Sequence, residues 1–263
     1  DKPTDLKNLN ITFTSNNSVY DGTNQWLSRK ITISIKNGAT TLPITTFDIS
    51  FSTDYSAGSA ESATWTAQPI DAGDYYLKVS VKDGYEQSFT GEQILQTPAK
   101  IIQRPMNITF SLAKSEIEEG EEPTVNIIPE ELGSNRGLVE GEEPEVSCKI
   151  DYQYNEDQTQ MTVTIKKDDI TVSENGKFKP SNYDIKYVIN GVTYRLSEDQ
   201  DGTEDVFPED GIELGTIDVT SPSTGGSFND HRYQLFLANK DYLKTDEKTV
   251  EYYEKLGLEL FSR

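Results

Sequence analysis

The tetrapeptide Asn-Ile-Thr-Phe occurs twice in this chain, at residues 10–13 and again at residues 107–110, a period of 97 residues (107 minus 10). In each copy a polar segment that ends in glycine follows shortly afterwards, Val19–Gly22 in the first and Ile117–Gly120 in the second. Such a period is typical of tandem domains that each close their own core, rather than of one large active-site fold. The repeat therefore predicts stacked modules and favours a binding or spacing function over catalysis.

The segments around these copies have the pattern of strands and turns. Thr, Ser, Tyr, Ile and Val crowd the periodic segments, and 11 prolines and 18 glycines interrupt them. This composition predicts a mostly β chain with little helix. Ile31–Ile35 alternates apolar and polar side chains and runs into an Asn37-Gly38 turn, as a hairpin strand requires. In the segment 73–81, Tyr75 and every second residue after it form one apolar face.

The middle of the chain combines clear strands with acidic runs. Met161–Ile165 and Tyr183–Ile189 alternate, and the second runs through Asn190-Gly191 into another polar-apolar stretch, which predicts a β-hairpin. Glu116–Glu122 contains five glutamates and Glu140–Glu145 contains four more. Like charges at this density favour solvated loops, and we expect both runs to be exposed.

These features divide the 263 residues into three parts. A first β module covers residues 1–105, because its closing strand, Ala99–Ile102, runs toward Pro105, and proline is expected to stop sheet pairing and mark a linker. A second β module covers residues 106–196. Residues 197–263 form either a shortened third module or an extension that completes the second. Within them His231–Leu237 is expected to be a strand, and Thr249–Leu258 a short helix or a terminal strand.

The charge balance limits the partners. With 45 acidic and 24 basic residues the formal charge is −21, so nucleic acid and anionic membrane surfaces would repel the chain. No run of about 18 apolar residues is present, so no membrane-spanning segment is expected. The chain begins Asp1-Lys2-Pro3 without a visible signal peptide, and we expect a mature or trimmed form whose export signal has been removed.

Candidate catalytic residues are few. Cys148 alternates with apolar residues in Val146–Ile150 and is expected to be a buried structural thiol. The only histidine, His231, is 83 residues away (231 minus 148) and lies in a different predicted module, so neither residue has the base or nucleophile that triad chemistry needs. One cysteine and one histidine also argue against a structural zinc site. We therefore expect no enzyme, no cofactor, and no catalytic, cofactor-binding or metal site.

Two weaker binding signals remain. Asp199–Asp205 places several oxygen ligands around Gly202, so weak calcium binding is possible, but the spacing does not match an EF-hand and a solvated acidic linker is the favoured alternative. Trp26 and Trp65, with the many tyrosines, could form a platform for sugar rings or a protein-binding patch. We expect Trp65 to be in the core, while the sequence leaves the exposure of Trp26 open.

The order of short motifs resembles a known family. Tyr20–Thr23, Ala72–Tyr75 and Gly84-Tyr85, followed by an isoleucine-rich strand, are similar to the MBG repeat modules of bacterial surface and secreted adhesin-like proteins. The second copy resembles a related variety at three places, which are Gly120–Pro123, Gly137–Gly141 and Ser181–Ile185. Together the matches cover residues 10–196. The resemblance implies small β-grasp-like or immunoglobulin-like sandwich modules, with no catalytic residues to carry over.

These observations lead to one expected function. The chain is expected to be a non-enzymatic bacterial cell-surface or secreted protein, adhesin-like or a spacer, that acts through protein or glycan contacts of its β modules. An extracellular or cell-surface location follows, in which a lipid anchor in the outer membrane is one option. The alternative is a carbohydrate-binding accessory protein of a glycan-uptake system.

Overall fold

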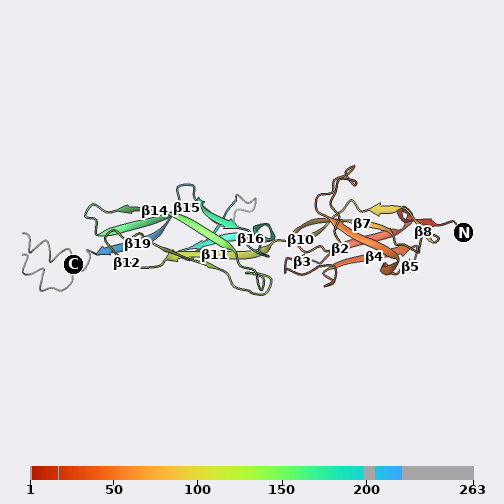
Figure 1. The fold of residues 1–263 in the computed structure, drawn as a ribbon, viewed down its shortest axis with the longest axis horizontal. Helices are drawn as coiled ribbons and strands as arrows, with labels where there is room; N and C mark the ends of the chain where they lie inside the picture. The colour runs from red at the N-terminus through yellow and green to blue at the C-terminus, as the bar shows by residue number, and fades with distance from the viewer. Residues whose placement is uncertain (1, 17, 198–204, 221–263) are drawn as a thin grey trace, which may run out of the picture. The chain divides into compact units, whose positions relative to one another are not determined.

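The computed structural model describes residues 2–16, 18–197 and 205–220 (Figure 1). Within these residues the regular elements are β-strands and three short 3-10 turns, η1 (Leu6–Asn8), η2 (Ile44–Thr46) and η3 (Pro180–Asn182), with no α-helix. The prediction of a mostly β chain with little helix is confirmed. The predicted elements at His231–Leu237 and Thr249–Leu258 lie outside the described residues.

The chain divides into two compact units that are described separately. The first consists of Asp1–Ser111, Val125–Asp151 and Thr164–Leu214. The second consists of Leu112–Thr124, Tyr152–Val163 and the segment from Gly215 onward, of which residues 215–220 are described. The boundaries of the predicted modules remain predictions.

The N-terminal part of the first unit contains ten strands. They are β1 (Thr4–Asp5), β2 (Asn10–Ser15), β3 (Ser18–Val19), β4 (Ile31–Asn37), β5 (Thr40–Thr41), β6 (Phe47–Ser52), β7 (Gly73–Val81), β8 (Phe89–Thr90), β9 (Glu92–Ile94) and β10 (Ala99–Ile102). One sheet has the order β2-β4-β5, another has the order β3-β10-β7-β6 with β9 also paired to β7, and β1 pairs with β8. The predicted strand and the predicted turn of the first hairpin are both present. β4 and β5 pair antiparallel around Gly38, whose φ is +59°.

These sheets share an apolar core. Phe13 of β2 meets Phe51 of β6 with ring centroids 5.9 Å apart, and Ile31 and Ile35 of β4 are also buried. On β7 alternate residues are buried as the pattern predicts, with Leu77 fully covered. The two-residue periodicity therefore determines which face of each strand is covered.

Nine further strands follow. They are β11 (Arg104–Leu112), β12 (Glu116–Glu118), β13 (Val125–Pro129), β14 (Glu145–Tyr154), β15 (Gln160–Ser173), β16 (Tyr183–Ile189), β17 (Val192–Arg195), β18 (Asp205–Val206) and β19 (Ile212–Thr220). One sheet has the order β13-β11-β16-β17-β18 and another the order β12-β19-β15-β14. The predicted hairpin is confirmed: Ile189 pairs with Val192, and both Asn190 and Gly191 have positive φ, as a tight hairpin turn requires.

The two copies of the repeated tetrapeptide are strands with the same inward face but different neighbours. Ile11 and Phe13 are buried on β2, and Ile108 and Phe110 are buried on β11. However, β2 pairs antiparallel with β4, whereas β11 pairs parallel with β16. The tetrapeptide therefore specifies a strand and its buried face, but not the strand beside it.

The glycine-bearing segments that follow the tetrapeptide are more alike. β3 pairs parallel with β10, and β12 pairs parallel with β19. Just after each short strand, the N–H of Tyr20 donates to Ile102 in one copy and the N–H of Glu119 donates to Thr220 in the other. A glycine with positive φ then turns the chain away, Gly22 at +74° and Gly120 at +88°. Each copy thus contains a short strand held parallel to a later strand.

The structure bears on two predicted boundaries, the one at Pro105 and the one at residue 197. Pro105 does not stop sheet pairing, because it lies within β11 opposite Asp184, and only Gln103 separates β10 from β11. Proline tolerates this position since its carbonyl is available and accepts the N–H of Gly137 at 2.8 Å. In the predicted third part, β18 pairs with β17 and β19 pairs with β12.

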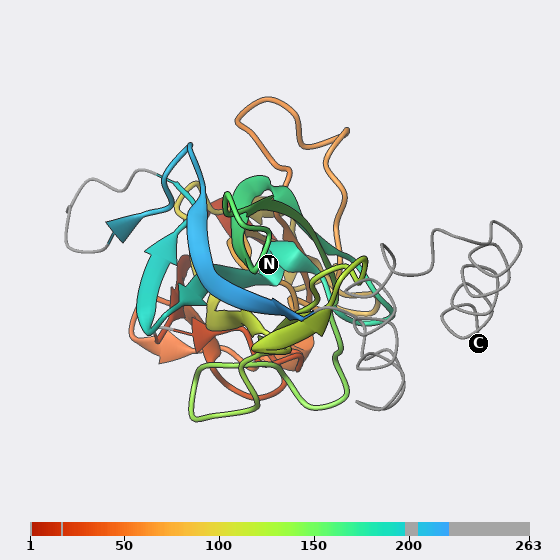
Figure 2. The same ribbon diagram turned by 90° about the vertical axis from the view of Figure 1, so that its left-hand side faces the viewer.

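The segment between β6 and β7 is the longest connection in the N-terminal part of the first unit. It projects from the sheets as the orange loop in Figure 2. Thr66 pairs back to Phe51 as an isolated bridge, with hydrogen bonds of 2.8 Å in both directions. Asp54 accepts the N–H of Thr64, which fixes the loop again close to its base. The loop is therefore anchored at two points by hydrogen bonds.

Candidate functional site

The most unusual side chain in the first unit is Glu142, whose carboxylate is buried. Only 6% of the residue is exposed. Its Oε1 atom accepts the hydroxyl of Tyr20 at 2.5 Å, and its Oε2 atom accepts the hydroxyl of Tyr183 at 2.7 Å. Tyr183 also accepts the N–H of Val139 at 3.1 Å. The carboxylate is thus satisfied by two charge-assisted hydrogen bonds.

Arg104 is buried in the same region, with 3% of the residue exposed. Its guanidinium donates only to main-chain oxygens in the bonds described here: Nε to Gly137 at 2.7 Å, Nη2 to Gly133 at 2.7 Å and to Arg136 at 2.8 Å, and Nη1 to Tyr20 at 3.3 Å. A planar fork of donors suits such a set of carbonyls better than a lysine would. The arginine therefore holds the loop 133–137 against the start of β11 and the end of β3.

A third group of contacts joins Asn182 to the segment before β7. Asn182 is fully buried, and its Oδ1 atom accepts the N–H of Ala72 at 2.8 Å. Its Nδ2 atom donates to Asp71 at 2.9 Å, and Lys179 forms an ion pair with the same carboxylate at 2.7 Å. Together with the contacts of Glu142 and Arg104, these interactions form what we call the junction network. Its members are Tyr20, Asp71, Arg104, Glu142, Lys179, Asn182 and Tyr183.

Several of the short motifs that suggested the family resemblance, but not Gly84-Tyr85 or Gly120–Pro123, contribute residues to the junction network or contact it. Tyr20 and Gly22 belong to the first motif, and a Cβ at Gly22 would come within 2.9 Å of the Val139 side chain. Gly137 and Val139 belong to a motif of the second copy, and Asn182 belongs to another. The structure thus brings together turn residues that are far apart in the sequence, which the sequence analysis did not predict.

The electrostatics of the junction network favour neutral tyrosines. Burial, and then the hydrogen bond to Glu142, raise the pKa of Tyr20 above its ordinary value of 10.0. The same causes in the same order raise the pKa of Tyr183. Burial would raise the pKa of Asp71, but hydrogen bonds from Lys179 and Asn182 keep it below the ordinary 3.8. The tyrosine hydroxyls therefore stay protonated at neutral pH and can donate to the carboxylate.

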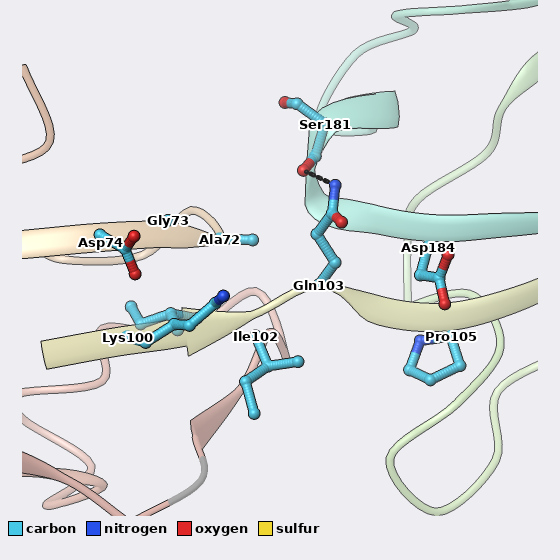
Figure 3. Close-up of a pocket in the computed structure, with 10 residues that line it drawn as sticks. Ala72, Gly73, Asp74, Lys100, Ile102, Gln103, Pro105, Ser181 and Asp184 are labelled. Atoms are coloured by element: carbon cyan, nitrogen blue, oxygen red, sulfur yellow. Dashed lines mark hydrogen bonds between the residues drawn. The ribbon is translucent and has the colours of Figure 1, made fainter. Parts of the chain in front are cut away.

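A groove lies beside this network in the first unit (Figure 3). It has a volume of about 420 Å³ and is lined by residues at the start of β7, along β10 and at the starts of β11 and β16. Its polar groups are the side chains of Lys100, Asp74 and Asp184, and the amide of Gln103, which donates to the carbonyl of Ser181 at 3.0 Å. The groove is open and has charges of both signs. Its lining also includes the apolar residues Ile101, Ile102 and Pro105, so the groove offers both charged and apolar contacts.

Cys148 lies where the alternation predicts, but it is less covered than expected. It shares one face of β14 with Val146 and Ile150, and all three are half-buried. Burial, and then the negative charge of Asp169, raise the pKa of its thiol to about 11. A thiol with a raised pKa is a poor nucleophile at neutral pH. The thiol is therefore less buried than the sequence predicts, and its structural role stays a prediction.

The two tryptophans are both half-buried. Trp26 packs on Phe51 with ring centroids 6.3 Å apart, so it is tied to the core. Trp65 lies on the loop between β6 and β7, where its ring meets Tyr55 at 5.8 Å and has the ammonium group of Lys78 over it at 4.5 Å. Its indole N–H donates to Ala60 at 3.2 Å. The expectation that Trp65 is a core residue is therefore only partly right. Its ring packs within the loop between β6 and β7 and is half-buried, not fully buried.

Other predicted binding residues fall mainly outside the described part of the chain. Of the calcium candidate Asp199–Asp205 only Asp205 is described, at the start of β18, and His231 is not described. Among the described residues no three His, Cys, Asp or Glu side chains are grouped so that they could hold a metal ion. No helix among these residues is long and apolar enough to cross a membrane.

The acidic runs gave the clearest error. Both were expected to be solvated loops, yet Glu116–Glu118 is strand β12 with Ile117 buried, and Glu142 in the second run is a buried member of the junction network. All five glutamates of the first run are exposed as expected, so the error there concerns the strand and not the exposure of the charges. What distinguishes Glu142 from the neighbouring glutamates is its tertiary partners. One of them, Tyr20, is separated from it by 122 positions in the sequence. No local signal in the sequence distinguishes it.

Comparison with protein-family models, with curated proteins and with solved structures gives no match for this chain. What the structure itself establishes is an all-β chain with several small sheets. The similarity to MBG modules stays an interpretation of short motifs.

Proposed function

We propose that this chain is a non-enzymatic bacterial surface or secreted protein, in which β modules are joined in a fixed arrangement and act through contacts with an extracellular protein or glycan. The observation that carries the proposal is the junction network. It uses a buried carboxylate, a buried guanidinium and a buried amide only to bind together segments of the first and second predicted modules. Burying charges is costly unless their hydrogen bonds are well made, so such a network is expected where a defined geometry matters.

The finer fold assignment belongs to the same proposal. We infer β-grasp-like or immunoglobulin-like modules of the MBG kind. The recurrence of a short strand parallel to a later strand, followed by a glycine with positive φ, supports this inference in both copies. The order of the turn motifs along the chain is consistent with it.

The spacing role has a direct test by distance measurement between spin labels. Cys148 is first replaced by serine, and labels are attached at Thr12→Cys and Thr109→Cys, two exposed positions at the same place in the repeated tetrapeptide. We expect a single narrow distance distribution from double electron–electron resonance. Glu142→Ala should broaden it, because two tyrosine hydroxyls lose their shared acceptor, whereas the neighbouring Glu143→Ala should not, since Glu143 is exposed.

A broad distribution in the protein without the Glu142 change would refute a fixed arrangement and with it the spacer role. The location is tested separately. Antibodies against the chain should label intact producing cells, and labelling only after lysis would contradict the surface proposal. The two tryptophans give the carbohydrate-binding alternative little support, since Trp26 packs on Phe51 and Lys78 covers part of Trp65.

A further inference from the structure

β14 is an unusually long edge strand. It has ten residues and stands last in the order β12-β19-β15-β14, so within the described residues it has a neighbouring strand on one side only. An edge strand presents a row of main-chain N–H and C=O groups that can pair with another strand. Proteins usually protect such an edge with proline, a bulge or inward-pointing charge, and between Glu145 and Tyr154 there is no proline.

The two faces of β14 differ in chemistry. Val146, Cys148 and Ile150 are half-buried on the inner face, and this face continues with Tyr152 and Tyr154, which are 39% and 43% exposed. The two tyrosine rings meet edge to face, with centroids 6.2 Å apart. The apolar face of the strand thus extends to a pair of large rings that the described residues leave partly exposed.

The opposite face of the strand has charges in an informative order. Glu145, Ser147, Lys149, Asp151 and Gln153 alternate along it. Asp151 forms an ion pair with Lys166 at 2.7 Å, with somewhat less than half of each side chain exposed. Lys149 and Asp151, two positions apart, lie on either side of Ile150.

We propose that β14 pairs antiparallel with β14 of a second copy of this chain, in a twofold arrangement centred on Ile150. In this register two residues that face each other across the interface, one from each copy, have numbers that add up to 300. The rule applies to residues 146–154. Lys149 of each copy then faces Asp151 of the other, which gives two opposite-charge cross-strand pairs. This proposal does not rest on the proposed function.

The charges select this register among the alternatives. Residues directly opposite each other in an antiparallel pair lie on the same face, so only even sums keep the two apolar faces together. Sums of 296, 298 and 302 also pair seven residues or more. The sum of 296 places Glu145 opposite Asp151 of the other copy. The sum of 298 places the two copies of Lys149 opposite each other, and the sum of 302 does the same for the two copies of Asp151. Like charges directly opposite are destabilising, so the sum of 300 is favoured.

The same register covers the exposed rings. Tyr152 would lie opposite Cys148 of the second copy, and Tyr154 opposite Val146, while Ile150 lies opposite its own equivalent. Aromatic residues beside aliphatic ones are favourable cross-strand neighbours. A single pair of strands buries less area than a stable interface of about 1,200 Å² or more, so the association is expected to be weak and reversible. Two chains of charge −21 also repel each other, and salt near 0.15 M is needed to screen this repulsion.

Disulfide trapping tests the register. The Cys148→Ser/Ile150→Cys variant should form a covalent dimer under mild oxidation, because position 150 faces itself. The control is Cys148→Ser/Ser147→Cys, whose thiol is more exposed but would face Gln153 of the second copy. Faster trapping through position 147 than through position 150 would overturn the proposal.

Charge reversal tests the pairing independently. By sedimentation equilibrium at 0.15 M salt, Lys149→Asp and Asp151→Lys should each weaken dimerisation about tenfold or more, since both cross-strand pairs become repulsive. The double variant K149D/D151K should restore dimerisation, because the opposite-charge pairs return in reversed order. Far-UV circular dichroism checks that each variant keeps its sheets. The proposal would be refuted by a chain that stays monomeric at concentrations up to about 1 mM, where even a weak dimer should form. It would also be refuted by a dimer whose affinity is the same in all three variants as in the original chain.

Discussion

Removing one tyrosine hydroxyl from the junction network should have a cost that depends on how many partners it leaves unsatisfied. Tyr20→Phe leaves the Oε1 atom of Glu142 without its donor and removes a minor hydrogen-bond contact with Asn182, whereas Tyr183→Phe leaves both the Oε2 atom of Glu142 and the N–H of Val139 without their partners. A hydrogen bond to a charged group contributes about 1.5–3 kcal/mol, and a neutral one about 1 kcal/mol. We therefore expect a loss of about 1.5–3 kcal/mol for Tyr20→Phe and about 2.5–4 kcal/mol for Tyr183→Phe.

The assay is equilibrium unfolding in urea, followed by far-UV circular dichroism and by tryptophan fluorescence. Tyr75→Phe is the matched control, because its hydroxyl donates to the neutral carbonyl of Asp71 at 2.9 Å and its removal should cost about 0.5–1.5 kcal/mol. Since Tyr20 and Tyr183 share one carboxylate, the double variant should deviate from additivity by about 0.5 kcal/mol or more. If Tyr20→Phe costs no more than Tyr75→Phe, the carboxylate is not buried between the tyrosines and the reasoning fails.

Three further predictions follow from the same structure. The pKa of Asp71 is lowered in the folded state, so its contribution to stability is present above pH 3.8 and is lost as the pH falls through its folded pKa. Asp71→Asn should therefore make the melting temperature fall less steeply between about pH 5 and pH 2, and an unchanged slope in this range would contradict the prediction. Cys148, with a pKa of about 11, should react with a thiol reagent at pH 8 at least tenfold more slowly than the cysteine of Cys148→Ser/Ser147→Cys, and equal rates would show that the thiol is not shielded. Gly137→Ala should lower stability by more than about 3 kcal/mol, because its Cβ would overlap the Glu131 carbonyl oxygen. Gly141→Ala, with a similar φ and no atom within 4 Å, should cost only about 1 kcal/mol in thermal unfolding, and similar losses for the two variants would refute the close approach at Gly137.

The strands and hairpins could be predicted because their signals are local. Asn190-Gly191 between two alternating segments specifies a tight turn by backbone conformation alone, and the structure has both residues at positive φ. The alternation on β7 likewise identifies the buried face without knowledge of the neighbouring strands. Such signals need only a few consecutive residues, so one sequence is enough to detect them.

Strand partners were not accessible in the same way. The two Asn-Ile-Thr-Phe copies bury the same side chains, but one pairs antiparallel with β4 and the other parallel with β16. The tetrapeptide determines backbone conformation and burial, while the neighbour depends on connections that span tens of residues. Pro105 is a similar case, because a missing N–H stops pairing only if the strand beside it needs that donor.

The junction network escaped prediction for an energetic reason. A glutamate among glutamates is most stable in water, so Glu140–Glu145 is reasonably expected to be exposed. The two tyrosine hydroxyls, which donate to its carboxylate, make burial of Glu142 tolerable. Arg104 is equally costly to bury, and four carbonyl oxygens compensate it. Because each charge is satisfied by neutral groups, removing a partner leaves the charge buried and unmatched rather than exposed. Such a network tolerates few alternative geometries, which is why a change at Glu142 should affect the distance distribution between labels more than an equal change at exposed Glu143.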